Sequence, residues 1–334
     1  MTVANFLEMN PVICLASLCH WNWHHLDGNA KDMMDISNLC TQFTFTGSTD
    51  ESWFYLIPTA IENKGARGIN AILDGIAGVG NNDIVRVTQA LCNISQSLQE
   101  SIALLERMYE RCDPHVFYWN FRKYMGGWND ADEFPHGLKY EDGGNGQFFK
   151  FSGGSAAQTP LIQAFDIALG IKHYPTGERG LQSSVVEARQ RLANMADGEP
   201  VPPPANAYVL STRDYMPAGH RRFLEDLAAT CMIREFVLLN CSTAVVTENG
   251  DADQRAELRQ AYNQCVELMK TFRDKHIMIV SRYVIAPAKA GPSIQGRAGS
   301  ARDGDEATAK GTGGTDAIKF LRQMRAETTN TSIR

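Results

Sequence analysis

Two long runs of apolar residues repeat with the period of an α-helix, and they restrict this chain to a helical fold. The first lies between Asp83 and Cys112, where steps of three and four residues separate Ile84, Val87, Leu91, Ile94, Leu98, Ile102, Leu105, Met108 and Cys112. Such spacing places the side chains in one stripe along a helix. A second stripe runs from Asp253 to Ala286. With no convincing strand alternation and no internal repeat, the sequence predicts an all-α fold, a large bundle of mostly long helices.

Shorter helices are expected around these two. The sequence predicts them over Pro114 to about Met125, which is densely aromatic, and over residues 161–171, 183–195, 217–240 and 316–328. The proline-rich stretch 198–205 predicts a stiff linker. Residues from 287 to about 315 are rich in Gly, Ser and mixed charge, which predicts a mobile loop.

Charge and cysteine usage exclude several classes of protein. The formal net charge of −6 leaves no basic surplus to replace phosphate counterions, which argues against a nucleic-acid partner. The eight cysteines lie far apart with no C-x-x-C pair, which argues against a zinc site or a disulfide framework and suits a reducing cytoplasm. The apolar stretch Pro11–Cys19 is too short to span a bilayer, so neither a signal peptide nor a membrane helix is expected.

His276 is the most informative single residue. It falls on the apolar stripe of its helix, in line with Phe272, Ile279 and Tyr283. An imidazole there must satisfy two ring nitrogens, so it is either a hydrogen-bonded core histidine or a ligand. Arg273, three residues earlier, would be a solvated charge if taken alone. The pair together suits haem, whose iron takes a neutral nitrogen and whose propionates take a cation.

Other polar signals are weaker. The glycine-rich segment 310–316 precedes the last predicted helix and is either an anion-binding helix start or a flexible hinge; it lacks the ending of a phosphate-binding Walker loop. His20, His24 and His25 include helical spacing that suits a metal ion, but no acidic or thiolate residue accompanies them. No hydrolase nucleophile motif is present.

Read together, several segments resemble the indoleamine 2,3-dioxygenase family. Besides residues 310–316, they are Ser152–Gln158, Phe165-Asp166 with Leu169–Ile171, Asp214–Phe223, Arg234–Leu238 and His276–Ile285. The resemblance runs in order from about Pro11 to the C-terminus. It implies a haem b enzyme that adds both atoms of O₂ across the indole C2–C3 bond of L-tryptophan, giving N-formylkynurenine in the first step of the kynurenine pathway. It also implies a monomer without a nucleic-acid or membrane partner.

The resemblance also assigns roles to residues, none of them a catalytic acid or base. It implies that His276 is the proximal ligand of the haem iron, and that Arg273 lies near a haem propionate with Asp166 as its partner. The cofactor would also contact Gly154 and Ser155. Groups near the substrate would be the aromatic Phe54, Tyr55 and Phe117, the carboxylate-binding Arg122, the distal Ser155 and Ala156, and Thr312 in a loop over the pocket.

Two departures from the family pattern bear on activity. Pro58 stands where several family members carry a distal serine. Residues 1–40 are expected to be a remnant of the family's small N-terminal domain and linker, followed by the haem-binding catalytic domain over 41–334. In the family, the small domain helps to cover the substrate pocket. Loss of most of it would expose apolar surface and raise KM or abolish turnover. The alternatives are therefore a haem-binding sensor or carrier without turnover, or a helical scaffold; the electron donor and the choice among indoleamines stay open.

Overall fold

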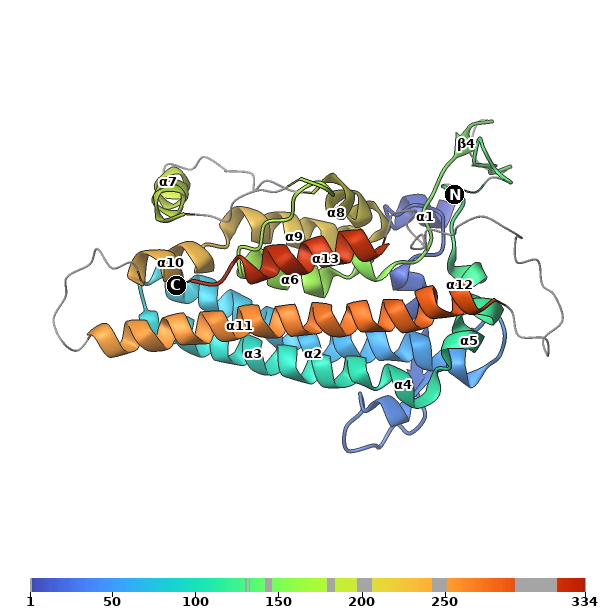
Figure 1. Ribbon diagram of the computed structural model, residues 1–334, viewed down its shortest axis with the longest axis horizontal. Coiled ribbons are helices and arrows are strands. Elements are labelled where there is room, and N and C mark those ends of the chain that lie inside the picture. Colours follow the sequence, from blue (N-terminus) through green and yellow to red (C-terminus); the bar gives the residue numbers. More distant parts are fainter. Residues whose placement is uncertain are drawn as a thin grey trace.

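Long helices lying lengthwise beside one another form the body of the protein (Figure 1). The computed structural model describes residues 2–129, 131, 133–141, 146–178, 184–196, 206–241, 251–291 and 317–333. Helices α2 (Thr49–Gly80), α3 (Ile84–Glu106) and α11 (Asp251–Val280) pack together along their length. A second layer covers them, in which α13 (Ala317–Thr329) lies against α11, α6 (Pro160–Ala168) against α2, and α9 (Ala218–Thr230) against α6.

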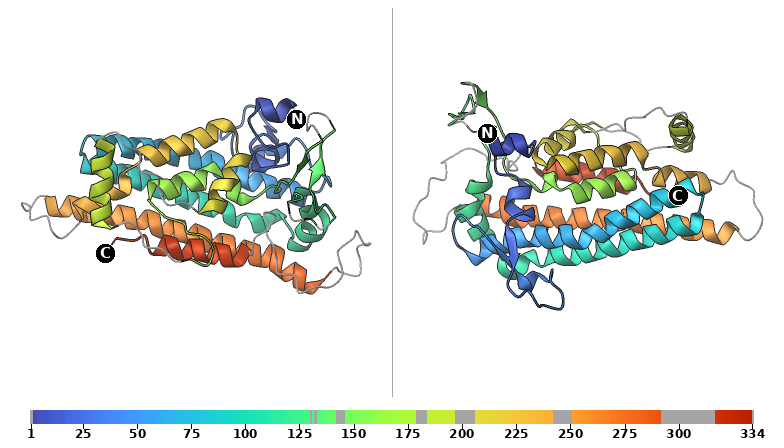
Figure 2. Two further views of the ribbon diagram at one scale, coloured as in Figure 1. Left: turned by 90° about the horizontal axis from the view of Figure 1, so that it is seen from above. Right: turned by 180° about the vertical axis from the view of Figure 1, so that it is seen from behind.

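The remaining elements are short and gather at the ends and edges of this body (Figure 2). The α-helices are α1 (Thr2–Phe6), α4 (Met108–Arg111), α5 (Pro114–Val116), α7 (Val185–Ala196), α8 (Ala207–Ser211), α10 (Ile233–Asn240) and α12 (Ala286–Ala290). Single π-helical turns are η1 (Ala16–His20), η3 (Phe117–Phe121) and η7 (Ser281–Ile285). The 3-10 turns are η2 (Ile36–Asn38), η4 (Arg122–Met125), η5 (Ala156–Gln158) and η6 (Thr212–Tyr215).

Two small antiparallel strand pairs were not expected from the sequence. Strand β1 (Trp23–His25) pairs with β2 (Leu39–Thr41), and β3 (Leu138–Lys139) pairs with β4 (Phe148–Phe149). Runs of two or three residues are too short to show an alternating pattern, which is why they escape sequence analysis. Each strand spans only two or three residues, whereas long helices form the body of the protein, so the predicted all-α class is confirmed.

The predicted stripes become the interface between α3 and α11. Leu91, Ile94 and Leu98 of α3 and Leu258, Tyr262, Cys265 and Met269 of α11 have no exposed surface. The Cys265 thiol donates to the carbonyl oxygen of Leu91 at 3.1 Å, and all eight cysteines are free, as predicted. No helix among the described residues is long and apolar enough to cross a membrane.

The ends of several predicted helices need correction. The stretch 217–240 is two helices, because the backbone is extended at Cys231 and lets Ile233 of α10 pack against Gly75 of α2. The helix from Asp251 continues through η7 into α12, so residues 287–290, predicted as the start of a mobile loop, are helical. The rest of that loop from residue 292, and the whole of the predicted linker at 198–205, lie outside the described residues.

Helix α2 is the one long helix that sequence analysis missed. Its interior carries Pro58, which cannot donate a backbone hydrogen bond, and several glycines that weaken helix formation. One of these, Gly68, is needed for close packing, since a Cβ there would lie 2.6 Å from the Phe165 ring of α6. The signal that sequence analysis missed is the capping pattern at the start of α2. The Ser48 side chain accepts the Glu51 N–H at 3.1 Å, and the buried Glu51 carboxylate accepts N–H groups of Phe45 and Thr46.

Gly170 ends α6 in a way that positions the segment after it. The Ile171 N–H donates to the Asp166 carbonyl oxygen at 2.8 Å and the Gly170 N–H to that of Ile167 at 3.0 Å, the Schellman pattern. Gly170 has a φ of +60°, and a Cβ at this position would lie 2.4 Å from Cδ of Arg234. Both the backbone conformation and the packing therefore require glycine.

Gly170→Ala is expected to destabilise the protein by at least about 1–2 kcal/mol, the cost of a left-handed conformation for an L-residue, with a further loss from the contact to Arg234. Gly219→Ala is the matched control, because Gly219 lies in α9 with nothing within 4 Å of an added Cβ. Urea unfolding of the two variants measures both effects. Equal stability of the two variants would contradict this account of α6.

Candidate haem site

His276 lies on α11, and its imidazole has no hydrogen-bond partner among the residues that the structure describes. The ring is partly buried. Burial, together with the positive charge of Arg273, lowers the pKa of His276 to about 4. The imidazole is therefore neutral near pH 7 and keeps a nitrogen lone pair for an iron ion.

Arg273, one turn before His276, is fixed by a buried ion pair. Its Nη2 donates to both carboxylate oxygens of Asp166 in α6 at 2.7 Å, and Nη1 donates to the Thr328 hydroxyl of α13 at 2.6 Å. Burial alone would raise the pKa of Asp166, but the charges of Arg273 and His173 hold it below its ordinary value. Three helices thus meet at the guanidinium that neighbours the candidate ligand.

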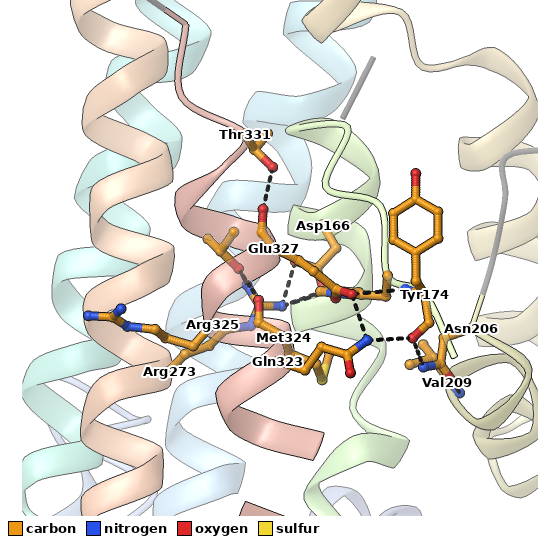
Figure 3. Close-up of polar contacts among 12 residues, drawn as sticks. Asp166, Tyr174, Asn206, Val209, Arg273, Gln323, Met324, Arg325, Glu327 and Thr331 are labelled. Carbon is orange, nitrogen blue, oxygen red and sulfur yellow. Dashed lines mark hydrogen bonds and ion pairs between the residues drawn. The ribbon is translucent and has the colours of Figure 1, made fainter. Parts of the chain in front are cut away.

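His173 and Glu327 extend this ion pair, and sequence analysis missed both. His173 Nε2 lies 3.2 Å from Asp166 Oδ2, and Nδ1 lies 2.7 Å from Glu327 Oε2. Figure 3 shows Glu327 of α13 facing the segment that carries Tyr174, whose N–H donates to Glu327 Oε1 at 3.1 Å. No pattern in the sequence points to this pairing, because 154 residues separate the two side chains.

An aromatic cluster lies about two helical turns after His276, where α11 continues into η7. The ring of Phe117 lies 4.7 Å from Phe54, 5.3 Å from Phe121 and 5.7 Å from Tyr283, measured between centroids. Phe54 and Phe117, both predicted from the sequence, are therefore in contact. The π-helical turn η3 at 117–121 inserts an extra residue into the helical stretch from Pro114 to Met125. Such distortions are frequent at functional sites.

The two other predicted residues of this region have different surroundings. Tyr55 is buried, and its hydroxyl donates to Glu51 Oε1 at 3.0 Å, so burial and Glu51 raise its pKa. Tyr55 thus forms part of the α2 N-terminal cap. Arg122 begins η4, with its guanidinium 5.3 Å from the Tyr118 ring centroid. Burial lowers the pKa of Arg122, which marks a cation shielded from bulk water.

The segment 152–158 is held rigidly against residues 125–127 and η1. A Cβ on Gly153 would lie 2.0 Å from the Met125 carbonyl oxygen, and one on Gly154 would lie 2.6 Å from Cδ1 of Leu18. The Ser155 hydroxyl accepts the Ala157 N–H at 3.2 Å and caps η5, whereas Ala156 is exposed. Thr312, the other predicted residue near the substrate, lies outside the described residues.

These groups fit haem. The donor set offers a neutral imidazole that no described residue hydrogen-bonds, a cation one turn away and an apolar aromatic cluster near the same helix. Within the described residues, no group of three or more His, Cys, Asp or Glu side chains lies close enough to hold a bare metal ion. His20, His24 and His25, whose spacing alone would suit a metal ion, form no such group; His24 and His25 belong to strand β1.

His20 instead lies beside His220, with ring centroids 5.9 Å apart. Both ring nitrogens of His20 are buried without a hydrogen-bond partner. Burial, and to a smaller extent His220, lowers the pKa of His20 to about 4. Between the ordinary imidazole pKa and this value, the unfolded chain binds a proton that the folded chain does not, so His20 costs stability as the pH falls.

His20→Leu is expected to stabilise the protein at pH 4.5 by roughly 1–3 kcal/mol more than at pH 7.5, because the substitution removes a buried, unpaired titrating group. Thermal unfolding across this pH range measures the difference. His24→Leu, at an exposed position, is the control and should show no such trend. A stability difference that does not change with pH would contradict the assignment.

Comparisons with known proteins agree with this geometry. A family model described as indoleamine 2,3-dioxygenase matches residues 1–331. Indoleamine 2,3-dioxygenase nanC of Aspergillus nanangensis is 34% identical over 98% of this chain and 72% of its own length. The indoleamine 2,3-dioxygenase of Saccharomyces cerevisiae is 32% identical, over 99% of this chain and 71% of its own. Indoleamine 2,3-dioxygenase 1 of Rattus norvegicus is 31% identical, over 96% and 68%.

Proposed function

The chain belongs to the indoleamine 2,3-dioxygenase family, and on that premise we propose that it is a haem b enzyme that inserts O₂ across the indole C2–C3 bond of L-tryptophan. The product is N-formylkynurenine, and the reaction opens the kynurenine route of tryptophan catabolism. The observation that carries the proposal is His276, a neutral, partly buried imidazole beside the buried Arg273–Asp166 pair; in the described part of the chain it has no hydrogen-bond partner.

Cofactor binding is assigned to residues of α11, α6 and the segment 152–158. His276 would hold the iron through its unprotonated nitrogen, and haem when bound supplies the binding and activation of O₂. Asp166 would keep Arg273 in one orientation near the cofactor, since both its carboxylate oxygens contact the guanidinium. Gly154 and Ser155 would approach the cofactor from the rigid segment 152–158, whose glycines keep backbone atoms close together.

Substrate binding would rest on the aromatic cluster and Arg122. Phe54 and Phe117 offer apolar ring faces for the indole. Arg122 would bind the substrate carboxylate, because its planar guanidinium can contact both oxygens. Ser155, Ala156 and Thr312 complete the proposed surroundings, with Tyr55 supporting Phe54 from the helix core. No side chain is proposed as a general acid or base.

We further propose that the protein works as a cytoplasmic monomer. Eight free thiols, five of them buried, are consistent with a reducing compartment. Residues 1–40 are proposed to belong to a small N-terminal domain and linker, and residues 41–334 to the catalytic domain. Leu15, Leu18 and Cys19 pack into the same hydrophobic core as α2, so part of the first segment contributes to the core of the catalytic domain.

His276→Ala is expected to abolish stoichiometric haem binding. The other described imidazole beside the Arg273–Asp166 pair, His173, has its two ring nitrogens facing Asp166 and Glu327 and offers no free lone pair to iron. The Soret band of protein reconstituted with haem measures the effect. His136→Ala, at an exposed loop position, should bind haem as the parent does. Full haem binding by His276→Ala would refute the proposed ligand. Bound ferrous haem in the parent that yields no N-formylkynurenine with tryptophan and air would instead favour a haem-binding protein without turnover.

Arg122→Lys is expected to lower kcat/KM for L-tryptophan by about 10–100-fold, the loss of a charge-assisted hydrogen bond of about 1.5–3 kcal/mol. The same variant should lose much less activity toward tryptamine, which lacks the carboxylate. Arg111→Lys is the matched control, since Arg111 is exposed and its guanidinium lies 5.0 Å from the Trp53 ring centroid. Equal losses with both substrates would contradict the proposed role of Arg122.

A further inference from the structure

His173 lies between two carboxylates that belong to different helices. Nε2 faces Asp166 of α6 at 3.2 Å, and Nδ1 faces Glu327 of α13 at 2.7 Å. A carboxylate oxygen only accepts hydrogen bonds, so both ring nitrogens must carry a proton to donate to both carboxylates. Nε2 also lies 3.3 Å from Nη2 of Arg273, but that nitrogen already donates to both Asp166 oxygens at the shorter distance of 2.7 Å. A neutral ring would leave a lone pair against one of the carboxylates.

The charges of this cluster point the same way. Asp166, His173, Arg273 and Glu327 are all at most 7% exposed. With His173 as an imidazolium, two cations balance two carboxylates; with a neutral ring, one buried carboxylate lacks a counter-charge, which is costly. Burial alone would lower the pKa of His173, but Asp166 and Glu327 raise it above its ordinary value, against a smaller opposing effect of Arg273.

Glu327 makes this histidine a link to the C-terminal helix. The other oxygen of Glu327 accepts the Tyr174 N–H at 3.1 Å and the Gln323 side-chain amide at 2.9 Å. Gln323 in turn donates to the Tyr174 carbonyl at 3.1 Å and accepts the Gly177 N–H at 2.8 Å. Figure 3 shows Gln323 and Glu327 on one side of α13, facing Tyr174.

We propose that His173, as an imidazolium, is a positioning residue that fastens α13 to the Asp166–Arg273 pair, and that α13 docks firmly only while His173 keeps its proton. Thr328 of α13 accepts a hydrogen bond from Arg273 at 2.6 Å, so release of the helix would free one side of the guanidinium. That Arg273 then acts on the haem rests on the proposed function; the docking of α13 does not.

The sign of the pH dependence follows from the raised pKa. The contribution of His173 is fully present below the ordinary imidazole pKa and is lost as the pH rises through the higher value of the folded protein. The charged groups facing the ring are Asp166 from α6, Arg273 from α11 and Glu327 from α13. The adjacent Lys172 pairs with Glu187 of α7 at 3.2 Å instead.

Hydrogen–deuterium exchange of residues 317–329, measured on the full-length protein between pH 6 and 9 and corrected for intrinsic exchange, tests the docking. In the parent protein, protection should fall by up to tenfold for each pH unit above the pKa of His173, as expected for one linked proton. Glu327→Gln should be nearly independent of pH, because its amide can donate to a neutral Nδ1 while its oxygen still accepts from Tyr174 and Gln323. Flat protection in the parent, or an unchanged pH trend in Glu327→Gln, would overturn the proposal.

Arg325→Gln is the matched control on the same helix. It removes a half-exposed ion pair with Asp274 of α11 (2.9 Å) but leaves His173 and Glu327 in place, so protection should still fall with pH as in the parent. Loss of the pH trend in Arg325→Gln would count against His173. The Soret band of the ferric haem protein gives the second readout. It should shift at the same pH midpoint in the parent and not in Glu327→Gln; a Soret band that does not follow the docking would overturn the positioning of Arg273.

Discussion

The buried ion pair between Arg273 and Asp166 is the interaction on which the arrangement of the second helical layer depends. It joins α11 to α6 directly and to α13 through the Thr328 hydroxyl. A guanidinium and a carboxylate this deeply buried are stable only when each is fully paired, so removing either partner would leave an uncompensated charge in the core. The pair therefore specifies how three helices meet, one turn from the imidazole proposed to bind iron.

The arrangement around α6 shows how local and long-range effects combine. The left-handed Gly170 ends the helix, and its missing side chain lets Arg234 pack closely. Arg234 donates to the Thr331 carbonyl at 2.5 Å and to the Tyr262 hydroxyl, which itself donates to Leu169. The C-terminal residues are thus tied to the same core as α11. One polar network thus joins chain segments at residues 166, 173, 234, 262 and 327. It depends on the turn at Gly170, on the buried Arg234 and Arg273, and on the buried His173.

The proposed substrate region, which includes Tyr283 about two helical turns after His276, is built from apolar contacts and one shielded cation. Phe54 comes from α2, Phe117 from η3 and Tyr283 from η7, and their rings touch at centroid distances of 4.7 and 5.7 Å. Two π-helical turns supply two of the three rings. Dioxygen chemistry at haem requires little proton transfer by the protein. An aromatic wall around the indole, with Arg122 proposed to orient the substrate, suits that requirement.

The sequence alone determined the helical class, the apolar faces of α3 and α11 and the place of His276 on one of those faces, because these depend on residues three or four apart. It also identified Asp166, Arg273, Phe54 and Phe117 as candidate site residues, through their resemblance to the indoleamine 2,3-dioxygenase family. Only the tertiary structure decided that α2 is helical despite Pro58 and its glycines, that Tyr55 serves the α2 cap, and that His173 meets Glu327. Those outcomes depend on packing and charge balance between segments far apart in the chain, where neither local propensity nor periodicity carries information.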